Sequence, residues 1–323
     1  MEKKPLIKAV GVVKNYGSLR ALDNFTADIP YGTIGLLGPN GAGKSTFIKA
    51  ILSLININAG TIEVLGQRCT SHNILLRKRI GYMPEHDCLP QSMDAVELVI
   101  TMGRIAGMSF VDAAQRAHQV LNYTGIGEER YRPIKTYSTG MKQRVKLAQA
   151  IVHDPDLLIL DEPTVGMDPL GREEMLSLIQ DISSSAGKNV LISTHILPDV
   201  EKLCSHVVMM LAGRVRAAGE INTLLGRDSN IYRIKVKCAD ENIKKFLAEL
   251  KKKRIETDTD KGGSDGEYII KMPDDATTSE IFKAATQYDI SLRSLRKGRV
   301  SIEEVFLETY QNIERQDRGI EKR

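Results

Sequence analysis

A single short stretch limits the fold of this chain more than any other feature. It matches the pattern G-x-x-x-x-G-K-[ST] and reads Gly38-Pro39-Asn40-Gly41-Ala42-Gly43-Lys44-Ser45-Thr46. The apolar run at 34–37 before it predicts a buried strand, and the run at 47–52 after it predicts a helix. Glycines let backbone N–H groups wrap around phosphate oxygens, because a side chain there would block close approach. The alternative, an ordinary glycine-rich turn, is disfavoured by the Lys-Ser-Thr continuation.

The end of this loop carries residues with expected roles. Lys44 should reach the β- and γ-phosphates of a nucleotide, and the Ser45 hydroxyl should ligate Mg²⁺. The helix that begins near Lys44 adds the positive end of its dipole. Tyr16, upstream of the loop, has two interpretations: a turn aromatic packed against the sheet edge, or a platform on which adenine stacks. These residues together predict a site for a triphosphate with Mg²⁺.

Composition limits the classes of protein that remain. The 323 residues suffice for one large domain and a smaller one, and 42% of them are hydrophobic, which is ordinary for a chain with a sizeable core. Aromatic residues are few and tryptophan is absent, so nothing suggests a base-stacking surface, and we expect no nucleic-acid partner. The net charge of +4 fits an anionic ligand or a membrane surface without selecting either.

The sequence offers no membrane segment of its own. No apolar core of a signal peptide follows residues 1–5, and no apolar run approaches the ~20 residues that span a bilayer. Four widely spaced cysteines match no metal spacing and indicate reduced thiols in a cytosolic protein. Any role at a membrane is therefore expected to come through a partner chain.

A strand at 80–83 ends at Pro84, and Glu85 follows at its carboxyl end, where α/β folds place ligand groups. Glu85 is either an exposed loop carboxylate or a residue that faces Mg²⁺ or water. From 94 to about 125 the pattern is helical and lacks strand signals. We interpret this stretch as a helical insertion in an α/β core. A further helix begins after Ser138, a suitable N-cap, and runs to about residue 153.

The apolar strand at 157–160 ends in two carboxylates, Asp161 and Glu162. Buried acids are costly without a cation, so this pair implies a metal or another charged partner. Asp161 is expected to hold Mg²⁺ through water. Glu162, pointing the other way along an extended strand, could polarise an attacking water.

Another buried strand, at 189–194, ends in a histidine. A lone histidine is more often structural, but His195 stands at a strand end beside the predicted phosphate site and could bond a γ-phosphate. Between these strands, a turn at 166–169 contains Asp168 and precedes a helix expected at 172–184. The alternation of strands and helices predicts an α/β fold with a mostly parallel sheet.

A second unit begins near residue 231. Its pattern predicts the order βαββαβ, which is typical of a ferredoxin-like α+β fold, with a glycine-rich turn at 261–266. We find no catalytic constellation in it. The basic run at 251–254 is interpreted as a solvated helix end, with contact to acidic lipid or protein as the lesser alternative. The residues after 311 are highly charged and predict a solvated tail.

With these motifs in this order, residues 5–225 resemble the ATP-binding cassette (ABC) family. The resemblance implies a P-loop NTPase core, ATP and Mg²⁺ as cofactors, and ATP hydrolysis. The matching positions are the Walker A loop at 38–46, the adenine-stacking aromatic Tyr16, the Walker B pair Asp161 and Glu162 with its catalytic glutamate, the D-loop residue Asp168 and the switch histidine His195.

The resemblance also implies a domain organisation. Residues 1–226 would form the ABC ATPase domain, with a helical subdomain at about 90–150. Residues 231–310 would form an accessory α+β domain, and 311–323 a charged tail.

Two departures from the family pattern bear on the site. The signature, usually Leu-Ser-Gly-Gly-Gln, appears here as Tyr137-Ser138-Thr139-Gly140-Met141. The glutamine usual in the Q-loop is replaced by Glu85, which could still approach Mg²⁺ but adds negative charge beside the triphosphate. Glu85, the continuation of the signature and the segment at 301–307 look like the ABC-2-type export subfamily.

The family resemblance implies a site shared by two cassettes. Two chains would close head-to-tail on two ATP molecules, with Ser138, Thr139, Gly140 and Met141 of one capping the γ-phosphate held by the other. A homodimer would then have two competent sites. Polytopic permease subunits would couple closure of the two cassettes to export of a cargo. The chain would be cytoplasmic and peripheral on the inner face of the cell membrane. The alternatives are a soluble cassette ATPase that works on ribosomes or DNA, or a nucleotide-gated regulatory module.

Overall fold

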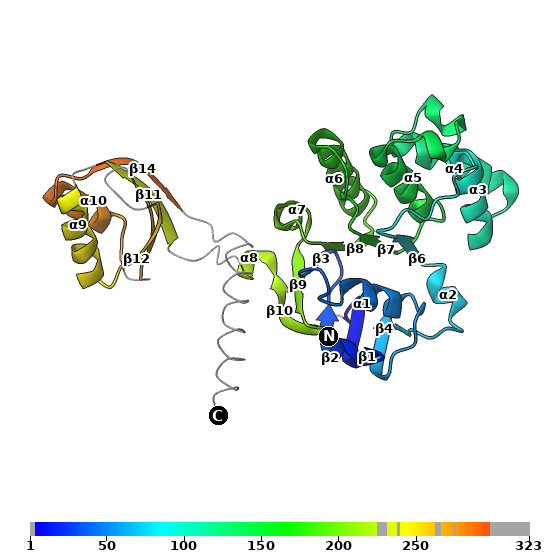
Figure 1. Ribbon diagram of the computed structural model, residues 1–323, viewed down its shortest axis with the longest axis horizontal. Helices are drawn as coiled ribbons and strands as arrows, with labels where there is room; N and C mark the ends of the chain where they lie inside the picture. Colours follow the sequence, from blue (N-terminus) through cyan, green and yellow to red (C-terminus); the bar gives the residue numbers. More distant parts are fainter. Residues whose placement is uncertain (1–3, 225–230, 238–239, 262–265, 274–275, 298–323) are drawn as a thin grey trace. The chain divides into compact units, whose positions relative to one another are not determined.

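A computed structural model describes residues 4–224, 231–237, 240–261, 266–273 and 276–297 of the chain (Figure 1). The chain divides into two compact units, Met1–Ile221 and Asn222–Arg323, and each is described here by itself. In the described part, no helix combines the length and the apolar character that crossing a bilayer requires.

A six-stranded sheet forms the centre of the first unit. Its strand order is β10-β9-β3-β8-β7-β6, and every neighbouring pair is parallel except β9 and β10. Every residue of β3 and β7 is buried, as expected for strands covered on both faces. The mostly parallel sheet predicted from the sequence is therefore confirmed. The strands are β3 (Thr33–Leu37), β6 (Ile80–Met83), β7 (Leu157–Asp161), β8 (Asn189–Thr194), β9 (His206–Leu211) and β10 (Arg214–Glu220).

A second sheet in this unit is antiparallel, with the order β2-β1-β4-β5. The sequence predicted the hairpin of β1 and β2 but not that β4 joins it on the other edge of β1. Helix α1 (Lys44–Ile51) packs its apolar face into the core beside this sheet, where the Phe25 and Phe47 ring centroids are 4.1 Å apart. The strands are β1 (Ile7–Tyr16), β2 (Leu19–Ile29), β4 (Ala59–Val64) and β5 (Gln67–Arg68).

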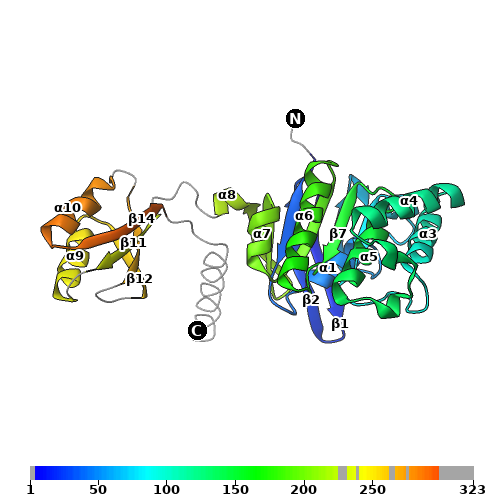
Figure 2. The ribbon, with the colours of Figure 1, turned by 90° about the horizontal axis from the view of Figure 1, so that it is seen from above.

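The predicted helical insertion is a separate group formed by α3 (Ala95–Ala106), α4 (Phe110–Tyr123) and α5 (Thr139–Ile151) (Figures 1 and 2). Side chains cap each of these helices at its N-terminus: Asp94 in a capping box, Ser109, and Ser138. Two short 3₁₀ turns, Glu128–Tyr131 and Ile134–Thr136, connect α4 to α5.

The remaining helices of the unit are α2 (Ile74–Arg77), α6 (Pro169–Ser184) and α7 (Leu197–Leu203), and the short helix α8 (Ile221–Leu224) begins at its last residue. Helix α6 begins before the predicted residue 172, because Asp168 caps it and Pro169 occupies the first turn. Proline suits that position, since its missing N–H would be unpaired there in any case.

The second unit has the element order that the sequence predicted. A four-stranded antiparallel sheet with the order β12-β13-β11-β14 carries α9 and α10. Phe246, Tyr268 and Ile281 belong to its own core. The turn at 262–265, the segment at 301–307 and the tail at 311–323 lie outside the described residues. The elements are β11 (Ile231–Lys237), α9 (Asp240–Lys252), β12 (Glu256–Lys261), β13 (Glu267–Lys271), α10 (Ser279–Gln287) and β14 (Ser291–Lys297).

Candidate active site

The predicted phosphate loop joins β3 to α1 and lines a cavity of about 630 Å³. Other parts of the chain complete its wall, so the cavity is assembled by the fold rather than by the loop alone. The lining residues are Tyr16, Leu19, Arg20, Ala21, Pro39, Asn40, Gly41, Ala42, Gly43, Lys44, Ser45, Thr46, Glu85, Glu162 and Ala212. The cavity thus brings together the loop, the proposed stacking residue and two of the predicted carboxylates.

Two glycines of the loop are required by close packing. A Cβ at Gly38 would lie 2.5 Å from the carbonyl oxygen of Met210, so the loop could not approach β9 so closely. Gly43 caps α1 with φ +103, and a Cβ there would lie 2.5 Å from the carbonyl oxygen of Ala21. The backbone path of the loop therefore depends on glycine at both positions.

Lys44 is a buried cation at the start of α1, with 7% of its surface exposed. Its Nζ donates to the carbonyl oxygen of Gly38 at 2.6 Å and lies 3.8 Å from Oε1 of Glu162. Burial lowers the pKa of Lys44, while Glu162, Asp161 and Glu85 oppose that effect. The carboxylates at and just beyond the ends of β6 and β7 thus act on the lysine of the phosphate loop, as a shared site requires.

Asp161 ends β7 and is 2% exposed. Its Oδ1 is buried and makes no hydrogen bond to any residue that the structure describes. Burial raises the pKa of Asp161, and the hydroxyls of Ser193 and Ser45 act in the opposite direction. A buried carboxylate oxygen without a partner, beside a serine hydroxyl, fits the oxygen ligands that Mg²⁺ prefers.

The described residues contain no cluster of three or more His, Cys, Asp or Glu side chains able to hold a metal ion by themselves. Mg²⁺ usually keeps several waters and binds through one or two carboxylates together with substrate phosphates. Asp161 and Ser45 are therefore compatible with a metal that arrives with its nucleotide.

Glu162 differs from the sequence prediction in its backbone. It follows the end of β7 with φ +50, so it does not continue an extended strand. Its N–H donates to the carbonyl oxygen of Ser193 at 2.9 Å. This left-handed conformation turns a 5% exposed side chain toward Lys44. A non-glycine residue with positive φ is unusual and commonly marks a functional position.

His195 lies one residue beyond β8, as predicted. Its Nδ1 is 3.0 Å from both carboxylate oxygens of Glu162, and the ring remains half exposed. A carboxylate can only accept, so Nδ1 carries the proton and Nε2 is left for another partner. The structure thus joins Glu162 and His195 in one unit that reaches Lys44.

The sequence predicted both the β1–β2 turn and the β9–β10 hairpin, but not that residues at the start of β2 and in the β9–β10 turn line the cavity. Leu19, Arg20, Ala21 and Ala212 line the cavity, yet they follow no phosphate-binding pattern. One backbone hydrogen bond, from the Asp23 N–H to the carbonyl oxygen of Gly213 at 3.0 Å, ties β2 to the β9–β10 turn. The signal that could have located them is only the proximity of the β1–β2 turn to Tyr16.

A buried ion pair behind His195 was also missed. Asp199 in α7 is 4% exposed and accepts hydrogen bonds from the guanidinium of Arg172 in α6, at 2.5 and 3.1 Å. The Thr164 hydroxyl donates to the same carboxylate at 3.2 Å. These bonds tie the helix after His195 to the helix after Asp168, so the two flanks of the site are linked.

The signature residues stand apart from the cavity. Ser138 accepts from the N–H of Met141 and caps α5, as predicted, and both Ser138 and Thr139 are exposed. Asp168 is exposed as well and caps α6 through the N–H of Gly171. Among the described residues that line the cavity, none comes from 138–141 or from the turn at 166–169.

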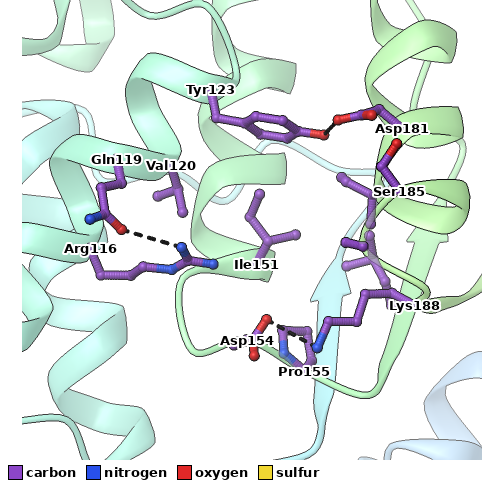
Figure 3. A pocket seen from close by; sticks show the side chains of 13 residues that line it. Arg116, Gln119, Val120, Tyr123, Ile151, Asp154, Pro155, Asp181, Ser185 and Lys188 are labelled. Atoms are coloured by element: carbon purple, nitrogen blue, oxygen red, sulfur yellow. Dashed lines mark hydrogen bonds and ion pairs between the residues drawn. The ribbon is translucent and has the colours of Figure 1, made fainter.

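A second cavity, of about 460 Å³, lies between α4 and the ends of α5 and α6 (Figure 3). Tyr123 and Asp181 form a hydrogen bond of 2.6 Å at its rim. Its lining contains Arg116 and Lys188 but no residue with a predicted chemical role. Of these two cavities, the one at the phosphate loop is therefore the one lined by residues with predicted chemical roles.

Comparison with known proteins identifies the family. Residues 22–165 match the model of the ABC transporter family. The daunorubicin/doxorubicin resistance ATP-binding protein DrrA of Streptomyces peucetius is 33% identical over 93% of this chain and 91% of its own length. The Nod factor export ATP-binding protein I of Cupriavidus metallidurans is 34% identical over 70% of this chain and 74% of its own.

A solved ATP-binding subunit of an ABC transporter superposes on this chain with a TM-score of 0.62 and 28% identity, covering 69% of this chain and 93% of that structure. In this same part of the chain, the phosphate loop and Glu162 line the cavity, and His195 lies beside it through its 3.0 Å contact with Glu162. The chain therefore belongs to the ABC transporter family, as an ATP-binding protein that hydrolyses ATP.

Proposed function

We propose that this chain is the ATPase subunit of a membrane exporter and that it works as a pair of cassettes. One observation carries the proposal: the phosphate loop and Glu162 line the cavity, while no residue of the signature at 138–141 on the same chain lines it. A second cassette would supply that missing wall. The names of the relatives, for drug resistance and for Nod factor export, support the direction of transport.

The residues that line the cavity, and those directly beside it, have different chemical roles. Lys44 and the loop backbone bind the phosphates, and Tyr16 stacks on the base. Ser45 and Asp161, with Glu85 nearby, would hold Mg²⁺, which supplies positive charge against the β- and γ-phosphates when bound. Glu162 orients the attacking water and accepts its proton. His195, fixed by Glu162 through Nδ1, directs Nε2 to the γ-phosphate.

Across the pair, the N-terminus of α5 closes the site of the neighbour. Ser138, Thr139, Gly140 and Met141 of one chain would face the γ-phosphate bound by the other, where free N–H groups and the helix dipole favour an anion. Asp168 would lie at the same contact. Because each chain carries one complete set of residues, a homodimer has two equivalent sites.

A groove on the same unit offers a contact surface for the permease partner. A groove of about 330 Å³ lies between α2, β6, α3 and α5. Ile74 and Ile105 line it and are 58% and 71% exposed, so the groove offers apolar surface to a partner. We propose that a cytoplasmic segment of a polytopic permease covers this groove, which would place the chain on the inner face of the membrane.

We further propose the domain limits 1–226 for the ATPase domain, about 90–150 for its helical subdomain and 231–310 for the accessory domain. The accessory strand order β12-β13-β11-β14 and its two helices favour a ferredoxin-like fold. Glu85 in the Q-loop position favours the ABC-2-type export subfamily.

Substitution of the catalytic carboxylate tests the mechanism. Glu162→Gln removes the proton acceptor and keeps the size of the side chain. We expect steady-state ATP hydrolysis to fall by at least about 100-fold, while an ATP-bound dimer accumulates on size-exclusion chromatography. Wild-type turnover in this variant would reject the assignment. Glu173→Gln, which changes an exposed carboxylate on α6, is the matched control and should leave turnover unchanged.

The partner class needs a separate experiment. Purification from gentle detergent extracts should recover the chain with a polytopic membrane protein. Recovery with ribosomes or DNA instead would favour a soluble cassette ATPase, and ATP binding without turnover would favour a regulatory module.

A further inference from the structure

Two lysines on α5 reach back to the loop that follows β6. Lys142 Nζ lies 2.7 Å from Oδ2 of Asp87, and Lys146 Nζ donates to the backbone carbonyl oxygen of Glu85 at 2.9 Å. Because they are four positions apart on a helix, both side chains leave the same face of α5. We call these four residues, Lys142, Lys146, Glu85 and Asp87, the lysine clamp.

The two contacts differ in burial. Lys146 is 2% exposed, although lysine is almost never fully buried without a partner. An ammonium group out of water needs hydrogen-bond acceptors and nearby anions, and the loop at 85–87 supplies both. Lys142 and Asp87 form the outer contact, with side chains 25% and 43% exposed. The path of the loop is therefore fixed by the helix at two points.

The clamp connects two places that serve different nucleotides. Glu85 lines the phosphate cavity of its own chain. Ser138 is the N-cap of α5, and under the proposed function it caps the nucleotide of the partner chain. The chain between them, 88–137, runs through α3 and α4, so the backbone gives no short connection. The side chains of the clamp provide that connection directly.

We propose that Lys142, Lys146 and Asp87 are positioning residues that couple occupancy of a chain's own phosphate cavity to the presentation of Ser138 to the partner chain. The inference rests on the proposed two-cassette site. With the clamp intact, the loop and the start of α5 move as one body when nucleotide meets Glu85. With the clamp broken, the loop adjusts alone and the position of Ser138 no longer depends on the nucleotide.

The test uses the full chain carrying Glu162→Gln, so that bound ATP is retained. Asp87→Asn and Lys142→Met each remove the outer ion pair without touching the phosphate loop. We expect the affinity of the single chain for ATP to stay within about twofold, while the dissociation constant of the ATP-bound dimer rises by about 10-fold, within the usual range of coupling between sites. Isothermal titration and analytical ultracentrifugation measure the two quantities.

Exchanging the charges of Asp87 and Lys142 distinguishes a positioning role of the ion pair from a general loss of structure. The double variant Asp87→Lys with Lys142→Asp rebuilds the ion pair in reverse and should restore ATP-driven dimerisation toward the parent. Arg79→Met is the control: it breaks the ion pair of 2.5 Å with Asp156 at the other end of β6 and should leave dimerisation unchanged. Thermal unfolding confirms that each variant is folded.

The outcomes are distinct. Single variants that dimerise like the parent, or a double variant no better than the singles, would overturn the clamp. A loss of ATP affinity equal to the loss of dimerisation would also overturn it, because the residues would then act on nucleotide binding itself. Absence of an ATP-bound dimer in the Glu162→Gln parent would instead reject the proposed two-cassette site, and the clamp with it.

Discussion

At the scale of single residues, Glu162 is held in its left-handed conformation by residues that lie far from it in the sequence. The phosphate loop, Asp161 and His195 follow patterns in which residue type and position along the chain imply the role. The backbone conformation of Glu162 differs from the extended one that its sequence position predicts. A carboxylate directly after a buried strand is expected to extend that strand, whereas the bond to Ser193 and the contact with Lys44 hold it at φ +50. Those contacts join residues far apart in the sequence, so no local sequence pattern predicts them.

The burial of Asp161 leads to a prediction about stability. Its pKa is raised by burial, so its ionised form costs free energy in the folded state. We expect Asp161→Asn to raise the midpoint of thermal unfolding in the absence of Mg²⁺ and ATP. The gain should shrink as the pH falls toward the raised pKa, because protonation of Asp161 removes the same charge.

The same substitution should weaken the response to the metal. Loss of the carboxylate is expected to lower the apparent affinity for Mg²⁺ in the presence of ATP by roughly 10–100-fold. Calorimetric unfolding and Mg²⁺-dependent ATPase assays check the two effects. Asp156→Asn alters a half-exposed carboxylate before β7 and is the control. A destabilised Asp161→Asn variant with unchanged Mg²⁺ dependence would contradict both expectations.

At the scale of helices and strands, local signals located most elements but not their partners. The serine that caps α5 was identified because a polar cap before an apolar-periodic run is a local feature. The pairing of β1 with β4 was not, because it depends on residues far apart in the sequence, such as Ile7 and Val64. The parts of the cavity wall that come from β2 and from the β9–β10 turn were missed for the same reason.

One hydrogen bond between elements has a testable effect. Tyr123 on α4 donates to Asp181 on α6 across the rim of the second cavity (Figure 3). Tyr123→Phe removes that donor and keeps the ring. We expect a small loss of stability, about 2 °C in the midpoint of unfolding, with faster amide exchange in α4. ATP affinity should not change, because the cavity at the phosphate loop lies elsewhere.

A matched variant distinguishes this bond from the ring itself. Tyr131→Phe changes another exposed tyrosine of the helical group and serves as the control. Equal exchange rates for α4 in Tyr123→Phe and in the wild-type chain would show that the bond does not restrain this helix.

At the scale of the whole molecule, the sequence predicted two units, and the described residues form two, each with its own core. Alternation of apolar residues was sufficient to order the elements of the second unit, because that signal is local. Its contribution to function is not encoded in any such pattern, since it carries no catalytic constellation. The assembly of a complete site from two chains came from the family resemblance, and the separation of the signature from the cavity supports it.

That separation has a kinetic consequence. If the wall of each cavity must come from another copy, a solitary chain binds ATP but cannot turn it over. The rate per chain should then depend on dilution, with total activity rising as the square of protein concentration until dimers predominate. Assays across about a hundredfold concentration range would reveal this curvature. If activity stays strictly proportional to protein concentration down to the lowest concentration, then either the two chains of the dimer never dissociate or a single chain is sufficient for turnover.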